Sequence, residues 1–199
     1  NMEIPNSINR FVLSSVEKEA NAKYVLFGVP ENGGSNGLAY FEGSAGGPDA
    51  IRKASQLYCA FHRTENGNLK TFVTNSYKSI TDESISLIDL GDKNKADVKD
   101  KITSLLQQGK FPIIIGGDHS ITYETLRGIN EYNKNFAVVY FDAHPDFRSS
   151  DKANRKSYAT VMYDASHLSN IKIKNSVQVG ISDIEAEELL QYVKAPDFP

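Results

Sequence analysis

The stretch FPIIIGGDHS at residues 111–120 and the stretch FAVVYFDAHPD at residues 136–146 decide how this chain folds. Each stretch begins with a short apolar run and ends in a cluster of polar side chains. Short bounded runs rich in β-branched and aromatic residues are typical of buried strands in a parallel sheet. Both polar clusters therefore follow the carboxyl end of a strand, and ligand sites of open α/β sheets form at this edge.

Strands and helices alternate along most of the sequence. Further strands are predicted at residues 24–29, 86–90 and 177–181, and helices at residues 50–61, 121–129 and 183–193. Strands separated by helices pair in parallel, and the helices cover both faces of the sheet. One more helix is indicated by an amphipathic stripe and is ended by a glycine; the residues concerned are Val98, Ile102, Leu105, Leu106 and Gly109. We therefore predict an α/β fold in which residues 1–199 form a single domain.

The composition excludes several classes of function. Hydrophobic residues make up 40% of the chain and charged residues 24%, as in globular proteins. The net charge is −3 and the basic residues are spread along the sequence, so nucleic acid and anionic membranes are not expected partners. No apolar stretch is long enough to span a bilayer. Cys59 is the only cysteine, which excludes an internal disulfide or a thiolate metal cluster and favours a reducing, cytoplasmic location.

The second polar cluster has the composition of a metal site. Asp142, His144 and Asp146 occupy alternate positions, and in an extended chain their side chains point the same way. His119, from the neighbouring strand end, completes a set of nitrogen and oxygen donors that suits manganese, zinc, iron or cobalt. The absence of thiolate ligands disfavours a structural zinc site. A carboxylate such as Asp142 can bridge two ions about 3.5–4 Å apart, which activates water near neutral pH.

The other polar residues also have structural interpretations. Asp118 and Ser120 precede a helix, so they can cap it or support the ligand side chains. The glycines at 116–117 can admit a phosphate to a helix N-terminus. A nucleotide-binding module is nevertheless disfavoured, because the P-loop lysine and the dinucleotide fingerprint are absent. His62 and His167 have no clustered partners, and we expect both to be ordinary structural or surface residues.

At these residues the chain resembles the ureohydrolases, the family of arginase, agmatinase, formimidoylglutamase and guanidinobutyrase. The resemblance rests on the GGDHS block at 116–120 and the DAHPD block at 142–146, which have the order and separation found in that family. GGPDAIR at 46–52, DLGD at 89–92 and VQVGI at 177–181 add to it. The resemblance covers nearly the whole chain, and its look is closest to prokaryotic agmatinases.

The resemblance implies a three-layer α/β/α fold around a parallel sheet and a site for two manganese ions. His119, Asp142 and Asp146 match ligands of one Mn²⁺ ion, and His144 matches a ligand of the other, which shares Asp142. The implied reaction is hydrolysis of a guanidino compound to urea and an amine, as when agmatine gives putrescine in polyamine metabolism. The resemblance also implies a small guanidino substrate as partner and a homo-oligomer.

The sequence departs from the family pattern in the metal ligands. Family members have a third block, Asp-x-Asp, that supplies the remaining ligands of both ions, and no Asp-x-Asp occurs here. The segment 183–185 (DIE) imitates it loosely, but Asp183 aligns better with a family segment near the tail of the substrate. We therefore expect an arginase-like domain that lacks its C-terminal part, with an incomplete site and low metal occupancy.

A second departure affects catalysis. Tyr158 stands where family members carry a histidine that shuttles protons or positions substrate. A phenol, with a usual pKa of about 10, is a poorer shuttle at neutral pH than an imidazole near about 6.5. Two hypotheses follow: an agmatinase-like manganese hydrolase, or a degenerate member that binds a ligand or partner without turnover. Arg148, near the last ligand, favours a substrate with a carboxylate tail, unless it pairs with a neighbouring acid.

Overall fold

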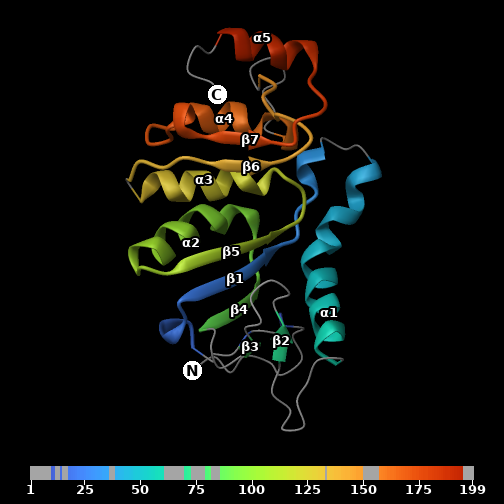
Figure 1. Ribbon diagram of the computed structural model, residues 1–199, viewed down its shortest axis with the longest axis vertical. Coiled ribbons are helices and arrows are strands. Elements are labelled where there is room, and N and C mark those ends of the chain that lie inside the picture. Colours follow the sequence, from blue (N-terminus) through green and yellow to red (C-terminus); the bar gives the residue numbers. More distant parts are fainter. Residues whose placement is uncertain are drawn as a thin grey trace.

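The computed structural model describes residues 10–11, 14, 18–35, 39–60, 70–72, 79–81, 86–132, 134–149 and 157–194, so the expectation for His62 lies outside the described residues. A parallel sheet has β1 (Tyr24–Val29) at its centre, between β4 (Leu87–Asp92) and β5 (Phe111–Gly116). A second parallel sheet pairs β6 (Val139–Phe141) with β7 (Val177–Val179). Figure 1 shows the first sheet in the lower half and the second in the upper half.

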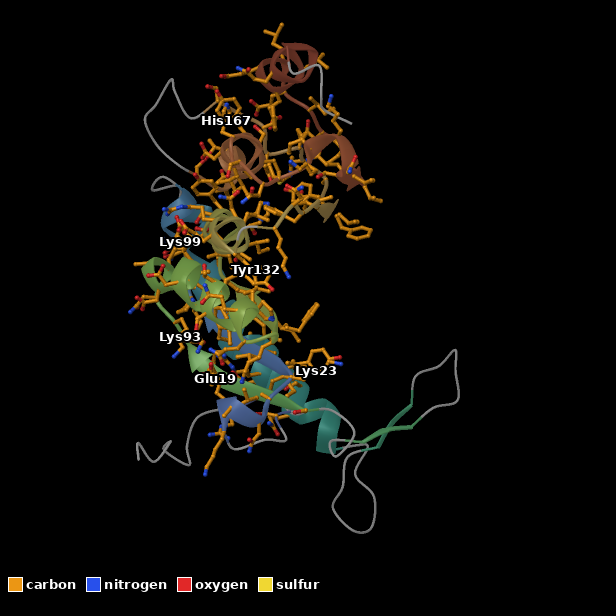
Figure 2. All side chains as sticks on the ribbon, turned by 90° about the vertical axis from the view of Figure 1, so that its left-hand side faces the viewer. Glu19, Lys23, Lys93, Lys99, Tyr132 and His167 are labelled. Carbon is orange, nitrogen blue, oxygen red and sulfur yellow. The ribbon has the colours of Figure 1, made fainter. Side chains whose placement is uncertain are left out.

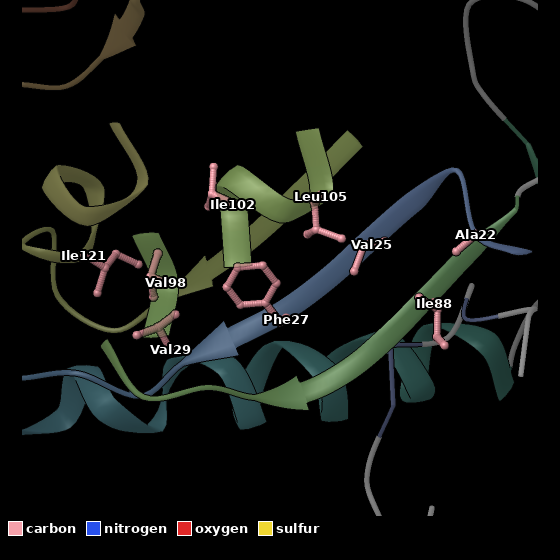
Figure 3. Packing of buried hydrophobic residues seen from close by; sticks show 9 residues of the cluster. All are labelled: Ala22, Val25, Phe27, Val29, Ile88, Val98, Ile102, Leu105 and Ile121. Atoms are coloured by element: carbon pink, nitrogen blue, oxygen red, sulfur yellow. The ribbon is translucent and has the colours of Figure 1, made fainter. Parts of the chain in front are cut away.

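One face of the first sheet packs against α2 (Lys95–Gln107). Alternate side chains of β1 point toward this helix (Figure 3), and three of the four apolar residues of its predicted stripe are buried, while Leu106 is partly buried. The buried residues are Val25, Phe27 and Val29 of β1 and Val98, Ile102 and Leu105 of α2. Gly109 follows the helix with φ of +70°, a conformation that glycine adopts without steric cost. The predicted end of this helix is therefore confirmed.

The opposite face is covered by α1 (Gly47–Ala60), which runs below β1 and β4 in Figure 3. This helix approaches β1 closely at Gly28, where an added Cβ would lie 2.7 Å from Pro48 Cβ. From α1, Arg52 reaches the buried Asp89 (Nε to Oδ2, 2.8 Å) and also Asp92 (2.5 Å). Burial opposes the charge of Arg52, but its hydrogen bonds to both carboxylates raise its pKa. Helices on both faces of parallel strands confirm the predicted α/β fold.

The remaining elements build the upper part of Figure 1. There α3 (Ile121–Glu131), α4 (Val161–Ser166) and the inner face of β6 enclose a second core, which includes Leu126, Tyr140, Val161 and Met162. The outer face of β6 is apolar and exposed; Val139 is 66% and Phe141 75% exposed. The chain continues into α5 (Ala186–Lys194).

Several boundaries differ from those predicted. Strand β6 begins at 139 and not at 136, and β7 ends at 179 and not at 181. The antiparallel pair of β2 (Lys70–Phe72) and β3 (Ser79–Thr81) was not predicted, and neither was α4. The described part of the chain also has 3₁₀ helices: η1 (Glu19–Asn21), η2 (Gly33–Ser35), η3 (Ala39–Gly46), η6 (Tyr158–Thr160) and η7 (Ile173–Asn175). Within the described part of the chain, no helix is both long and apolar enough to cross a membrane.

Candidate metal centre

Three predicted ligands come together beyond the carboxyl ends of β5 and β6. His119 follows β5, and Asp142 and Asp146 follow β6. One ligand atom from each lies within 4.8 Å of the others, and His119 Nε2 is 3.1 Å from Asp146 Oδ2. Asp146 is buried, whereas His119 and Asp142 are half-buried. An imidazole and two carboxylates at this spacing suit a divalent cation such as manganese.

The loop after β6 does not have the extended geometry that the alternating pattern predicted. The chain bends at Ala143 and His144, and Asp146 has a φ of +47°, in the left-handed region that few non-glycine residues adopt. The carbonyl of Asp146 accepts the backbone N–H groups of Met162 (3.0 Å) and Tyr163 (3.3 Å), which fix this turn against α4. The bend explains why His144 is not in the same group as Asp142 and Asp146.

Instead, His144 lies on the other side of Asp142. Asp142 Oδ1 accepts the backbone N–H of His144 (2.9 Å) and lies 3.5 Å from His144 Nδ1, while Oδ2 faces Tyr140. Burial opposes the charge of Asp142, but the backbone N–H of His144 and the nearby His119 lower its pKa. His144 Nε2 lies 3.9 Å from Asp183 Oδ2. A carboxylate placed between two imidazole groups fits one that is shared by two ions.

Tyr140 also belongs to this cluster, although it was not among the predicted site residues. Its Oη lies 2.8 Å from His119 Nε2 and 3.2 Å from Asp142 Oδ2, and it donates to Asp146 Oδ2. Its ring stacks on the His119 ring with 5.5 Å between centroids. Burial, together with Asp146 and Asp142, raises the pKa of Tyr140, so the hydroxyl stays protonated. The available signal was its position two residues before Asp142, on the same face of the strand.

Asp118 and Ser120 lie in a different network. Asp118 Oδ2 accepts the backbone N–H of Gly34 (2.8 Å), and Oδ1 accepts both the backbone N–H and the hydroxyl of Ser120. Lys95 Nζ donates to Ser120 Oγ (2.6 Å). Ser120 occupies the N-cap position of α3, but its side chain makes no capping bond. The two residues therefore fasten the turn at 33–35 to the loop before α3.

A cavity of about 220 Å³ borders the cluster. Two predicted ligands line it, His144 and Asp146. Three other predicted site residues also line it: Arg148, Tyr158 and Asp183. The remaining lining residues, which were not predicted, are Ala159, Glu185 and Glu188. No periodic pattern points to Glu188, which reaches the cavity from α5 and bonds to the distant Phe147.

The charges of this cavity are mainly negative. Arg148 forms an ion pair with Glu185, which is the alternative that the sequence had left open for this arginine. Glu188 is 4% exposed and accepts the backbone N–H groups of Phe147 and Glu185, each at 3.1 Å. Burial raises the pKa of Glu188. His167, which Figure 2 labels in the upper part of the molecule, lies at the end of α4 against the Tyr163 ring and does not line this cavity.

Comparisons of sequence and of structure with known proteins point to the same family. Residues 22–196 match the model of the Arginase family. An agmatinase of Neisseria meningitidis serogroup C is 31% identical over 184 residues, which are 90% of this chain and 57% of the relative. The crystal structure of an agmatine ureohydrolase of Thermoplasma volcanium superimposes with a TM-score of 0.68 at 28% identity, covering 96% of this chain and 59% of the other.

A structure of Trypanosoma cruzi formiminoglutamase with Mn²⁺ has a TM-score of 0.74, at 22% identity, over 95% of this chain and 63% of the other. At this level of identity the match shows a shared fold. The present chain thus spans less than two thirds of the length of each of these relatives.

Proposed function

Because this chain belongs to the arginase family, we propose that it carries part of the active site of a manganese-dependent hydrolase that releases urea from a guanidino compound. His119, Asp142 and Asp146 would hold one ion, and His144 with the second oxygen of Asp142 would contribute to another. The donor chemistry supports this proposal, since imidazole and carboxylate groups without thiolate suit manganese. When bound, manganese would lower the pKa of water toward about 7.

The cavity beside the cluster supports a cationic substrate. Arg148 is already paired with Glu185, so its charge gives little reason to prefer a carboxylate tail. Asp183 and Glu188 add further carboxylates to the lining, and Asp183 is exposed. A guanidinium group, or an amine at the far end of the molecule, would be attracted to such a surface. We therefore propose agmatine as the substrate, in preference to guanidinobutyrate or arginine.

In this proposal Tyr158 contacts the substrate. It lines the cavity on the side of Arg148 and Ala159, at the start of η6. Ser157 fixes that turn through a capping box with Thr160, which orients the segment. The Tyr158 hydroxyl would offer a hydrogen bond to the guanidino group or to the departing amine.

The test is urea release by the full-length protein supplied with Mn²⁺. We expect urea from agmatine at a higher kcat/KM than from guanidinobutyrate or arginine. His119→Asn should abolish urea release, whereas the control His167→Asn should not change it. A preference for guanidinobutyrate would refute the assignment of agmatine. The absence of urea from all three compounds, with Mn²⁺ shown to be bound, would refute the hydrolase.

The second candidate is a member of the family that binds a ligand without hydrolysing it. One observation favours this candidate: Tyr158 lines the cavity at the position where the family resemblance implies a histidine. Titration calorimetry with agmatine distinguishes the two candidates. Binding of agmatine that depends on Mn²⁺ but gives no urea would support this second function.

A further inference from the structure

We propose that the hydroxyl group of Tyr140 competes with manganese for the cluster of His119, Asp142 and Asp146. In the metal-free protein this hydroxyl would hold the three side chains together. It would have to give up its bond to His119 when the ion binds. The inference rests on the proposed function, because it takes this cluster to be a manganese site.

A single oxygen atom faces all three groups. Tyr140 Oη lies 2.8 Å from His119 Nε2 and 3.2 Å from Asp142 Oδ2, and it is also bonded to Asp146. Tyr140 is only 7% exposed, and its neighbours in the second core include Leu126 and Met162. The strand that carries it is fixed by parallel pairing with β7 at Gln178. The fold therefore holds the phenol in place beside the three side chains.

Competition follows from the chemistry of the imidazole. A neutral imidazole carries one N–H donor and one lone pair, so each ring nitrogen can serve a single partner. His119 Nε2 cannot bond to the Tyr140 hydroxyl and bind a cation at the same time. The other ring nitrogen, Nδ1, lies 3.1 Å from Thr122 Oγ1. Carboxylate oxygens have spare lone pairs, so the conflict concerns His119 more than Asp142 or Asp146.

The same hydroxyl stabilises the cluster when metal is absent. Two carboxylates at this spacing repel each other, and a donor placed between them offsets part of that repulsion. Tyr140 contributes this donor to Asp146 and, at a longer distance, to Asp142. Loss of the hydroxyl should therefore destabilise the metal-free protein and leave the ligands free to bind an ion.

The test compares Tyr140→Phe with the wild type and with Tyr163→Phe, a control in the same core whose ring packs on Phe147 and His167. The full-length protein is stripped with a chelator and titrated with MnCl₂ in a calorimeter. We expect Tyr140→Phe to bind Mn²⁺ up to about tenfold more tightly, because the variant no longer has the hydrogen bond to His119 that the ion must break. Its metal-free form should melt at a lower temperature than the wild type, and Tyr163→Phe should keep the wild-type affinity.

A second measurement uses the wild-type fold itself. Addition of Mn²⁺ should change the near-ultraviolet tyrosine spectrum of the wild type and of Tyr163→Phe, because one phenol changes its hydrogen bond. The spectrum of Tyr140→Phe should change much less.

Weaker Mn²⁺ binding by Tyr140→Phe would show that the phenol is itself a ligand, and it would overturn the proposal. Unchanged Mn²⁺ binding would also overturn the proposal. If His119→Asn binds Mn²⁺ as tightly as the wild type, the manganese site itself fails. That outcome refutes the proposed function as well, and is thus distinct from the other two.

Discussion

Replacing Arg52 by methionine should destabilise the protein by about 3–5 kcal/mol, because a buried carboxylate would lose its charged partner. Arg52 is 3% exposed, and the side chain of Asp89 is fully buried. Two of the guanidinium nitrogens of Arg52 bond to Asp89, at 2.8 and 3.0 Å, and a third bonds to Asp92 at 2.5 Å. Asp89 also accepts the backbone N–H of Gly91, so it cannot turn toward water without breaking that contact.

The assay is equilibrium unfolding in denaturant, with Lys53→Met as the matched control on the same helix. Lys53 pairs with Asp49 at 2.5 Å, but both side chains are more than half exposed, and such pairs contribute less than about 1 kcal/mol. In a domain of this size the loss at Arg52 corresponds to a fall in Tm of about 6–20 °C. Adding Asp89→Asn to Arg52→Met should recover part of the loss, because it removes the uncompensated charge. Equal destabilisation by Arg52→Met and Lys53→Met would show that the buried ion pair contributes no more than the exposed one.

Three further predictions concern the site and the turn beside it. If the protein is a hydrolase, Tyr158→His should raise the rate near pH 7 by up to about 10²-fold, and identical pH–rate profiles would remove Tyr158 from the mechanism. Burial raises the pKa of Glu188, so the folded state holds this proton more tightly than the unfolded state. As the pH rises through the raised pKa, the free energy of unfolding of the metal-free wild type should therefore fall relative to that of Glu188→Gln. A difference between the two proteins that does not change with pH would contradict this. Gly34→Ala should cost about 1–3 kcal/mol in denaturant unfolding, since its Cβ would lie 2.6 Å from Ser120 Cβ; a neutral effect would show that the turn can move.

Local patterns predicted most of the elements. Strand β1 has the predicted bounds, and the buried stripe of α2 was read directly from its spacing. The two polar blocks were also placed correctly at the ends of β5 and β6. These features depend on neighbours along the chain, which is the information that hydrophobic periodicity contains.

Features that depend on distant residues could not be read in the same way. The motifs at 46–52 and 89–92 are separate blocks in the sequence, yet Arg52 of α1 pairs with Asp89 of β4. The convergence of Asp142 with Asp146 needs the left-handed turn at Asp146, which depends on α4 and not on the alternating pattern. The apolar strand pattern does not distinguish Tyr140 from its neighbours, although its hydroxyl faces the three predicted ligands.

We propose that Asp142 is shared between two manganese sites. The most direct measurement is the number of Mn²⁺ ions bound per chain of the full-length protein, by equilibrium dialysis and metal analysis. We predict two ions for the wild type and for the control His167→Asn, one ion for His144→Asn, and none bound tightly for Asp142→Asn. Wild-type stoichiometry in Asp142→Asn would show that the two ions do not share this carboxylate.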